Sequence, residues 1–432
     1  MQVHLKALGC RLNEAELENW SQRFGADGHT LTRIVGDAEL LVLNTCAVTA
    51  EAVRKSRRTI HRLQRENPNA KLVVSGCYAS LAPEEAAAAG VDLVVENRDK
   101  DRLVEIAREQ LDLPAMPAAA SAPGAAAIFA QGRQRAFIKV QDGCRYRCSF
   151  CIVTVARGAE RSRPLAEIIA QINALVSQGV QEAALTGVHV GGYGADLGDG
   201  SDLYTLIATI LAETDLPRLR LASVEPWDLP DNFFELFQNP RLMPHMHLPL
   251  QSGADSVLRR MARRCKTAEF RALVARARSA VADFNPTSDV IVGFPGESDD
   301  EWRQTLDFVA EIGFGQLHIF SYSPRAGTRA ARLPDPLDKA TKRARSRELH
   351  ELAARMKRDA LTRFVGREFE VLWEGDGERL DGGRWRISGY TPNYLRVSAE
   401  VDDGPARYNR IERVRCLAVA DDGQRLLADL AG

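Results

Sequence analysis

Three cysteines lie close together in the segment DGCRYRCSFC, at positions 144, 148 and 151. This spacing lets one tight loop present three thiolates to a compact centre. Soft thiolates favour an iron–sulfur cluster or zinc over hard cations. A structural zinc normally has four protein ligands, and a zinc ribbon would need a second Cys-x2-Cys pair, which the sequence lacks. The segment therefore indicates a metal centre for which this loop supplies only three ligands.

Three further cysteines each end an apolar run that reads as a strand: ALGC at Cys10, LNTC at Cys46 and VSGC at Cys77. The intervals between them each fit one strand–helix–strand crossover. In a parallel sheet the carboxyl ends of the strands share one edge, where ligands bind. A single buried cysteine can simply fill space as a small apolar residue. Three in the same relative position predict a second three-cysteine site. Cys265 and Cys416 stand alone and are predicted to be free or packed.

The elements that must position these cysteines divide the chain into five segments. Residues 1–111 alternate strands and amphipathic helices, which predicts a parallel α/β sheet domain. The Ala/Pro-rich segment 112–134 is typical of a linker. Residues 135–340 predict a partial (β/α)6 barrel, and 341–365 a basic connecting helix. Residues 366–432 carry short strands with Gly-rich turns, which predicts a small β-barrel.

The partial barrel is predicted from six apolar runs separated mostly by helical patterns. Its strand segments are AFIKVQ, EAALTG, RLRLAS, HMHLPL, SDVIVGF and LHIFSYS. Six units fall short of the eight that close a complete barrel of this type. Cys144 follows the first of these strands, so its loop is expected at the mouth of the barrel.

Composition places the chain among globular proteins. Its 432 residues are 45% hydrophobic and 27% charged, with a formal net charge of −1. The N-terminus has no secretory signal pattern, and no apolar run is long enough to span a membrane. We expect a cytoplasmic protein whose cysteines are reduced. The near-neutral charge gives no general attraction to nucleic acid, so an RNA partner would be held by local patches.

Cys-x3-Cys-x2-Cys after the first barrel strand resembles the signature of the radical S-adenosylmethionine superfamily. The whole chain is similar to one family within it, the methylthiotransferases, in which a three-cysteine α/β domain, a radical domain and a small TRAM barrel follow in this order. The stretches that carry the likeness are SVEPWDL, HLPLQSGADSVLRRMARR, DVIVGFPGE and SYSPRAGTRAA. LGCRLNEAE and GYTPNY resemble the branch that acts on threonylcarbamoyladenosine of tRNA. The chain departs from the family at Thr154 and Val155, where an Ile-Pro-aromatic segment is usual.

The resemblance implies two 4Fe–4S clusters, one on Cys144, Cys148 and Cys151 and the other on the three N-terminal cysteines. S-adenosylmethionine would chelate the open iron of the first cluster and yield a 5′-deoxyadenosyl radical, which abstracts hydrogen at C2 of adenine. The second cluster would carry or deliver sulfur, and a second S-adenosylmethionine would methylate it. The implied partners are the anticodon loop of tRNA, an electron donor such as flavodoxin or ferredoxin, and a sulfur donor. A monomer is expected.

Seven residues are predicted to contact S-adenosylmethionine. By resemblance, Phe150 packs against the adenine, and the loop after the second barrel strand meets the methionyl amino group. Ser223 and Glu225 end the third strand on one face, where they would accept hydrogen bonds from the cofactor. For the strand-end residues the alternatives are ordinary turns or a solvated carboxylate. The full set is Phe150, Thr186, Gly187, Ser223, Glu225, Gln251 and Gly293.

RNA contacts are predicted in two places. Arg54, Arg57 and Arg58 lie on a basic helix that starts soon after Cys46, although such runs are often only solvated helix faces. Near the C-terminus, Tyr390, Asn393 and Tyr394 suit stacking on unpaired bases or hydrogen bonding to them. The alternative for these tyrosines is the core of the small barrel.

The predicted function is insertion of a methylthio group at C2 of N6-threonylcarbamoyladenosine 37 in tRNA. Two alternatives keep this chemistry and change the target, to isopentenyladenosine of tRNA or to an aspartate of a ribosomal protein. An alternative of another class is a zinc-stabilised RNA-binding protein without catalysis. The absence of a fourth cysteine in either set argues against it.

Overall fold

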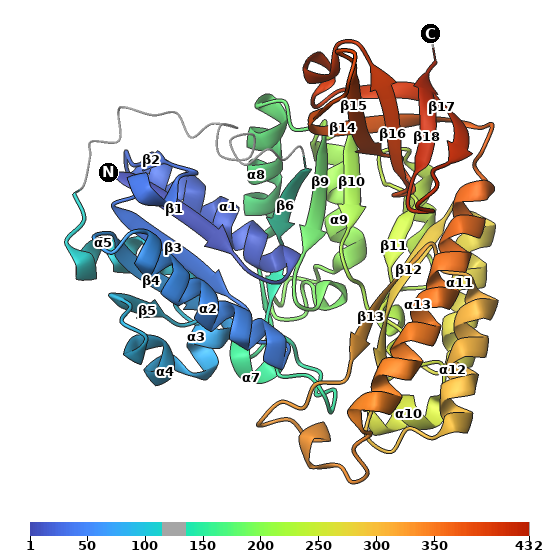
Figure 1. Ribbon diagram of the computed structural model, residues 1–432, viewed down its shortest axis with the longest axis horizontal. Helices are drawn as coiled ribbons and strands as arrows, with labels where there is room; N and C mark the ends of the chain where they lie inside the picture. Colours follow the sequence, from blue (N-terminus) through green and yellow to red (C-terminus); the bar gives the residue numbers. More distant parts are fainter. Residues whose placement is uncertain (115–134, 432) are drawn as a thin grey trace.

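The N-terminal part of the molecule is a five-stranded parallel sheet with helices on both faces (Figure 1). The computed structural model describes residues 1–114 and 135–431. The strand order is β2-β1-β3-β4-β5. The strands are β1 (Gln2–Ala7), β2 (Thr30–Leu31), β3 (Leu40–Thr45), β4 (Lys71–Gly76) and β5 (Leu93–Val95). The helices are α1 (Arg11–Ala26), α2 (Ala50–Glu66), α3 (Cys77–Leu81), α4 (Pro83–Ala88) and α5 (Leu103–Leu111).

Alternation along the central strand β3 builds two separate cores. Leu40 and Val42 pack with α1 and α5, whereas Leu41 and Leu43 pack with α2, α3 and α4. Successive strand residues point to opposite faces, so a strand covered on both sides is apolar throughout. The predicted parallel α/β sheet is confirmed.

The middle of the chain forms six parallel strands in two three-stranded sheets, ordered β10-β9-β6 and β11-β12-β13. Bridges between Leu219 and Leu242 and between Ser223 and His247 join the two sheets, so β6 and β13 are the end strands of a partial barrel. The strands are β6 (Arg135–Lys139), β9 (Glu182–Thr186), β10 (Arg218–Leu221), β11 (His245–His247), β12 (Asn285–Val292) and β13 (Gln316–Ser321). All six predicted barrel strands are present.

Helices cover the outer face of the partial barrel. Their buried residues pack with alternate strand residues, such as Ile138 and Leu185, in one large core. These helices and the short ones of the loops are α7 (Val153–Arg157), α8 (Leu165–Ser177), α9 (Leu203–Glu213), α10 (Asp255–Arg260), α11 (Thr267–Ala280), α12 (Asp299–Ile312) and α13 (Lys339–Thr362). The remaining strand residues face the inside of the barrel, which we call the lumen.

Helix α1 of the N-terminal sheet lies against the lumen side of β6. Ala15 packs with Phe137 and Ala184, and the Glu18 carboxylate accepts a hydrogen bond from the Phe137 N–H at 3.0 Å. An end strand presents unpaired backbone groups, and Glu18 of α1 accepts a hydrogen bond from one of them here. The contact places the start of α1, directly after Cys10, beside the lumen.

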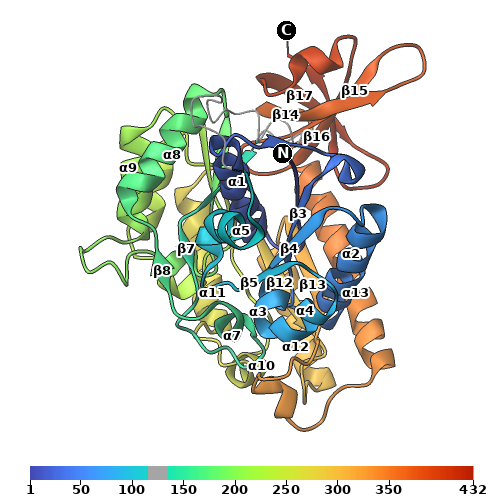
Figure 2. The same ribbon diagram turned by 90° about the vertical axis from the view of Figure 1, so that its left-hand side faces the viewer.

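The C-terminal residues form a closed five-stranded barrel, as predicted. It binds the amino ends of the partial-barrel strands, where Arg218 donates to Glu370 O at 2.9 Å and Arg220 to Pro392 O at 2.7 Å. Figures 1 and 2 show it at the opposite end of the molecule from α7 and α10. The strands are β14 (Glu368–Arg379), β15 (Trp385–Tyr390), β16 (Arg396–Val401), β17 (Ile411–Val419) and β18 (Leu426–Leu430). The C-terminal barrel therefore does not cover the carboxyl ends of the six barrel strands, where the cysteine loop lies.

The described elements follow one another in the predicted order. The segment boundaries after residues 111, 134, 340 and 365 stay predictions, and residues 115–134 of the expected linker lie outside the described part of the chain. Within residues 1–114 and 135–431, none of the helices has the length and apolar character needed to traverse a bilayer.

Candidate functional site

The loop after β6 brings three thiols together at the carboxyl end of the barrel. We call Cys144, Cys148 and Cys151 the barrel cysteine site. A short antiparallel ribbon, β7 (Gln141–Asp142) with β8 (Arg161–Ser162), closes the loop at its base. The loop is held inside by hydrogen bonds from Cys144 N to Gly158 O at 3.2 Å and from Cys151 N to Cys148 O at 3.1 Å. These backbone contacts hold the three cysteines on one compact loop.

The electrostatics of the barrel cysteine site fit a bound cation. Burial, together with the neighbouring Cys148, raises the pKa of Cys144 to about 11 and that of Cys151 to about 12. Burial also raises the pKa of Cys148. Three buried thiolates would repel one another, and iron at their common centre removes that penalty. The residues present therefore fit a cluster held by this loop.

The other three cysteines converge as well. Cys10, Cys46 and Cys77, the N-terminal cysteine site, follow the carboxyl ends of β1, β3 and β4. A Cβ placed on Gly9 would lie 2.6 Å from Cys46 Sγ, which shows how closely the two strand ends approach. Burial raises the pKa of Cys46 to about 11, with further contributions from Cys10 and Cys77. This donor set also fits an iron–sulfur cluster.

Helix starts and two amides surround the N-terminal cysteine site. Cys10 immediately precedes α1, where no side chain caps the helix, and Cys77 is the first residue of α3. Burial raises the pKa of the Cys10 thiol, and Arg157 and the hydrogen bond with Asn13 oppose that rise. Asn13 Oδ1 lies 3.7 Å from Cys10 Sγ, and Asn97 Nδ2 lies 3.8 Å from Cys77 Sγ.

Glu225 lies beside the barrel cysteine site, but its carboxylate is already engaged by Arg263. The two N–O distances are 3.0 and 2.6 Å, and Arg263 is 3% exposed. The guanidinium also lies 4.0 Å from Cys148 Sγ and 4.4 Å from the centre of the Trp227 ring. Cofactor binding by Glu225 stays a prediction, and the structure adds that Arg263 holds its carboxylate in place. Sequence reasoning gave Arg263 no role at this site, since nothing local reveals its burial.

Phe150, Gln251 and Gly293 lie around one apolar group. Phe150 packs with Ile291, Phe294 and other members of that group, which suits the flat face of an adenine. Gln251 is buried at φ 77°, a strained value for a residue with a side chain. Gly293 is explained without a ligand, because the Lys342 side chain fills the place of its Cβ at 2.3 Å. Cofactor contacts for Phe150, Gln251 and Gly293 stay predictions.

The other predicted cofactor residues lie at the ends of β9 and β10. Thr186 is buried at the end of β9, and Gly187 follows against Gln141, whose backbone oxygen lies 3.0 Å from the position of a Cβ. Ser223 is half-buried where β10 meets β11 through its bridge to His247. All three lie at the end of the strands where the cysteine loop starts, and their cofactor contacts stay predictions.

His189, in the loop after β9, anchors the cysteine loop. His189 Nδ1 lies 2.5 Å from Glu160 and Nε2 lies 2.5 Å from Asp228. Although burial opposes the charge, Asp228 and Glu160 raise the pKa of His189. The Tyr146 hydroxyl, from within the loop, donates to Asp228 at 2.8 Å. The imidazole therefore connects the cysteine loop to the strand ends beyond β9 and β10.

The open side of the lumen carries cationic and imidazole groups. Arg11, the first residue of α1, lies 4.9 Å from the centre of the Phe137 ring, and its side chain is 53% exposed. His247 and His318 lie across the lumen with ring centres 5.5 Å apart, and Asp289 is 3.2 Å from His247. Burial, then His247, and then Arg11 lower the pKa of His318.

The predicted RNA residues have mixed surroundings. Arg54 and Arg58 are exposed on α2, while Arg57 donates to the Tyr78 hydroxyl at 3.2 Å and pairs with Glu85. RNA contacts for these three arginines stay predictions.

The C-terminal set lies between the two barrels. Asn393 is buried, and its amide donates to Asp283 O, so the structure gives it an interdomain contact in place of the expected RNA contact. Tyr390 and Tyr394 stack with ring centres 4.6 Å apart, beneath the guanidinium of Arg135. Both rings are half-buried, and RNA contacts for the tyrosines stay predictions.

Two family models match the chain. Residues 138–309 match the Radical SAM superfamily, and residues 2–96 match a model described as uncharacterized protein family UPF0004. Among solved structures, the radical S-adenosylmethionine methyltransferase TsrM from Kitasatospora setae has a TM-score of 0.56 at 16% identity, over 76% of this chain and 77% of that one. The structural likeness shows the fold alone.

Named relatives match over almost the whole chain. The threonylcarbamoyladenosine tRNA methylthiotransferase MtaB of Bacillus subtilis is 34% identical over 91% of this chain and 89% of that protein. A tRNA-2-methylthio-N(6)-dimethylallyladenosine synthase of Cereibacter sphaeroides is 36% identical over 96% of each chain. A 4Fe–4S cluster and S-adenosylmethionine are therefore cofactors of the barrel. The chain belongs to the methylthiotransferase family of radical S-adenosylmethionine enzymes.

Proposed function

We propose that this protein inserts a methylthio group at C2 of N6-threonylcarbamoyladenosine 37 in tRNA, with a second 4Fe–4S cluster on the N-terminal cysteine site. The observation that carries the proposal is the short helix α7 between the two cysteine sites. Asn97 Nδ2 donates to Ala156 O of this helix at 2.7 Å and lies 3.8 Å from Cys77 Sγ. Cys151 is two residues before the same helix. A reaction that joins a radical site to a sulfur source needs both near one substrate.

When bound, the cofactors supply the 5′-deoxyadenosyl radical that removes hydrogen from C2 and the methylated sulfur that replaces it. The chain's own residues position the reactants. The two cysteine sites hold the clusters, and the Glu225–Arg263 pair places a fixed cation beside Cys148. Helix α1 covers the lumen side of β6, which limits water access from that direction.

The choice of threonylcarbamoyladenosine rests on the charge at the open side of the lumen. Its threonyl group ends in a carboxylate, whereas a dimethylallyl group is neutral and apolar. Arg11 has a single weak ion pair in the described structure, 3.8 Å from Glu14 on the same helix, and it lies directly after Cys10. A half-exposed guanidinium here suits a substrate carboxylate, because Arg binds carboxylates through two parallel hydrogen bonds. His318 adds a second polar group on β13.

Methylthiolation of short anticodon stem-loops tests both parts of the proposal. Anaerobically reconstituted enzyme is given RNA that carries either threonylcarbamoyladenosine or dimethylallyladenosine, and the nucleosides are identified by mass spectrometry. We expect product from the first RNA. Product from the second RNA alone would favour the alternative tRNA target, and no product from either would favour a ribosomal-protein substrate.

Arg11→Gln tests the basis of the choice. It should raise KM for the threonylcarbamoyl RNA roughly tenfold or more, which corresponds to losing one charge-assisted hydrogen bond. Arg62→Gln is the matched control, because Arg62 also has a weak ion pair on its own helix, at 3.6 Å from Glu66, and is similarly exposed. Equal KM values for wild type and Arg11→Gln would contradict this assignment.

A further inference from the structure

A buried group of charged side chains lies between the two cysteine sites, centred on Arg157 at the end of α7. Its Nη1 lies 2.9 Å from both Glu16 Oε1 and Asp142 Oδ1, and its Nη2 donates to Asn13 Oδ1 at 2.8 Å. The side chains of Arg157, Glu16 and Asp142 are each 2% exposed. Because Glu16 and Asn13 belong to α1, this one residue ties the barrel loop to the N-terminal sheet.

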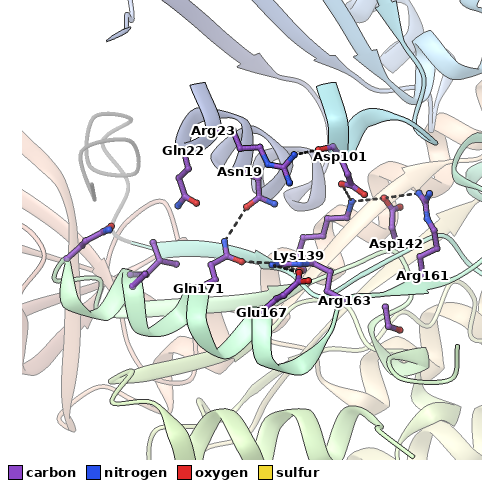
Figure 3. A pocket seen from close by; sticks show the side chains of 14 residues that line it. Asn19, Gln22, Arg23, Asp101, Lys139, Asp142, Arg161, Arg163, Glu167 and Gln171 are labelled. Atoms are coloured by element: carbon purple, nitrogen blue, oxygen red, sulfur yellow. Dashed lines mark hydrogen bonds and ion pairs between the residues drawn. The ribbon is translucent and has the colours of Figure 1, made fainter. Parts of the chain in front are cut away.

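Two lysines complete this group, which we call the interdomain charge cluster. Lys100 Nζ lies 2.7 Å from Glu16 Oε1, and Lys139 Nζ lies 2.9 Å from Asp142 Oδ2. Their side chains are 0% and 4% exposed. Asp101 also approaches Lys139, at 3.0 Å, but it is 62% exposed, so water screens its charge. Figure 3 shows Lys139 between the carboxylates of Asp101 and Asp142, at the wall of a cavity of about 490 Å³.

The interdomain charge cluster has an excess of positive charge. Three buried cations face two buried carboxylates, and a buried charge without compensation is costly. Burial lowers the pKa of Lys100 and Arg157 lowers it further, as expected where cations are crowded. The group therefore requires a nearby anion.

The cluster proposed on the N-terminal cysteine site would supply such an anion. Among the interactions that raise the pKa of Arg157 against the effect of burial are those with Cys77 and Cys10. Asn13 contacts both Arg157 and Cys10, at 2.8 and 3.7 Å, so guanidinium and thiol share one intermediary. No comparable link to the barrel cysteine site is found among the described residues, although Arg157 is six residues beyond Cys151.

We infer that Arg157 is a positioning residue whose fixed charge sets the reduction potential of the cluster on the N-terminal cysteine site and leaves the barrel cluster unaffected. The inference rests on the proposed second cluster. A nearby positive charge stabilises the more negative, reduced form of an iron–sulfur cluster and so raises its potential. Arg157, which contacts both cysteine-bearing parts of the chain, thus also tunes the cluster proposed to deliver sulfur.

The test uses the full chain with Cys144, Cys148 and Cys151 replaced by Ala, so that only the N-terminal cysteine site can hold a cluster. Its midpoint potential is measured by a redox titration followed by electron paramagnetic resonance. Arg157→Gln should shift the potential to lower values, whereas Arg157→Lys, which keeps the charge, should stay close to the parent. Arg161→Gln is the control, because Arg161 is 44% exposed and 3.9 Å from Asp142. The midpoint potential of the cluster should not change in this variant.

Each outcome decides the inference. An unchanged potential in Arg157→Gln, or loss of iron from both the Gln and the Lys variants, would overturn it. Loss of iron from the Gln variant alone would support it, because the Lys variant keeps the positive charge and the Gln variant does not. Absence of iron in the parent, before any change at Arg157, would refute the second cluster and this inference with it. In the complementary chain, with Cys10, Cys46 and Cys77 replaced, Arg157→Gln should leave the barrel cluster's potential unchanged, and a shift there would count against the inference.

Discussion

Glu225 and Arg263 form a two-bond ion pair in which the guanidinium has almost no contact with water, at 3% exposure. Glu225→Gln keeps the size of the side chain and removes its charge, so Arg263 stays buried opposite a weaker acceptor. We expect the free energy of unfolding of the metal-free protein to fall by about 1–3 kcal/mol. Chemical denaturation under anaerobic, reducing conditions measures this change.

The control for Glu225 is a pair with the same chemistry on the surface. Glu311 binds Arg271 through two contacts as well, but the two side chains are 48% and 49% exposed. Exposed ion pairs contribute little because solvent screens them. Glu311→Gln should leave the stability unchanged. Equal effects of the two substitutions would show that burial of Arg263 does not control the strength of its pair.

Burial and long-range pairing also explain which site residues the sequence could reveal. The convergence of six cysteines into two sites was predictable because each lies at a strand end or in one short loop, and these features are local. Arg263, His189 and Arg157 were missed because their partners lie 38, 39 and 141 residues away in the sequence. A basic or polar residue within a loop has no local pattern that separates a solvated side chain from a buried one.

At the scale of elements, the loop that carries the barrel cysteines depends on one glycine. Gly143 has φ 71°, and a Cβ there would lie 1.9 Å from Ala159 O, a backbone atom that cannot move alone. Gly143→Ala should displace the start of the loop and lower the iron content of the reconstituted protein by up to half. Iron and acid-labile sulfide assays measure the loss.

Gly158 in the same loop provides the matched control. It has a similar φ of 77°, but a Cβ there would meet nothing within 4 Å. Gly158→Ala introduces only backbone strain, about 1–3 kcal/mol, and should keep the full iron content. Normal iron in Gly143→Ala would show that the loop accommodates the clash.

The same distinction between local and tertiary information holds for the elements. The strands of both sheets follow from apolar runs, so the α/β sheet, the six-stranded partial barrel and the C-terminal barrel were all predictable. The packing of α1 on the lumen side of β6 was not, because it depends on a contact between Ala15 and Phe137 from different segments. Tyr390 and Tyr394 were ambiguous for the same reason: an aromatic side chain serves an interface or a ligand equally well.

At the scale of the whole molecule, Glu182 connects the partial barrel to the C-terminal barrel. It is fully buried and pairs with Arg135 and with Arg220, and Arg135 also lies 2.9 Å from Glu374. Despite burial, Arg135 and Arg220 lower the pKa of Glu182 to about 2, from an ordinary value of 4.5. A carboxylate with a lowered folded-state pKa stabilises the protein above its unfolded pKa and loses that contribution as the pH falls toward its folded pKa.

The expected pH dependence follows from that sign. Wild type should be more stable than Glu182→Gln by an amount that is constant above pH 4.5 and shrinks by on the order of 3 kcal/mol as the pH falls toward 2. Urea unfolding of both proteins across this range measures the difference. The exposed Glu378, on β14, serves as the control, and Glu378→Gln should show no such trend. A stability difference that does not change with pH would contradict the prediction.

The iron content is a property of the whole molecule, because the two cysteine sites belong to different sheets. If each holds one 4Fe–4S cluster, the protein contains roughly eight irons with matching sulfide. Replacing Cys10, Cys46 and Cys77 by Ala should halve the iron and stop methylthio transfer. Cleavage of S-adenosylmethionine to 5′-deoxyadenosine should persist, since the barrel cysteine loop is held by its own backbone hydrogen bonds.

The complementary change separates the two roles. Replacing Cys144, Cys148 and Cys151 by Ala should also halve the iron, but it should abolish cleavage of S-adenosylmethionine. Chromatography of 5′-deoxyadenosine and mass spectrometry of the RNA nucleosides read out the two activities in the same reaction. Methylthiolated adenosine from the protein lacking Cys10, Cys46 and Cys77 would exclude a sulfur-delivery role for that site. Stoichiometric zinc in the unmodified protein would exclude clusters at both sites, because tightly bound zinc would occupy the same thiolates.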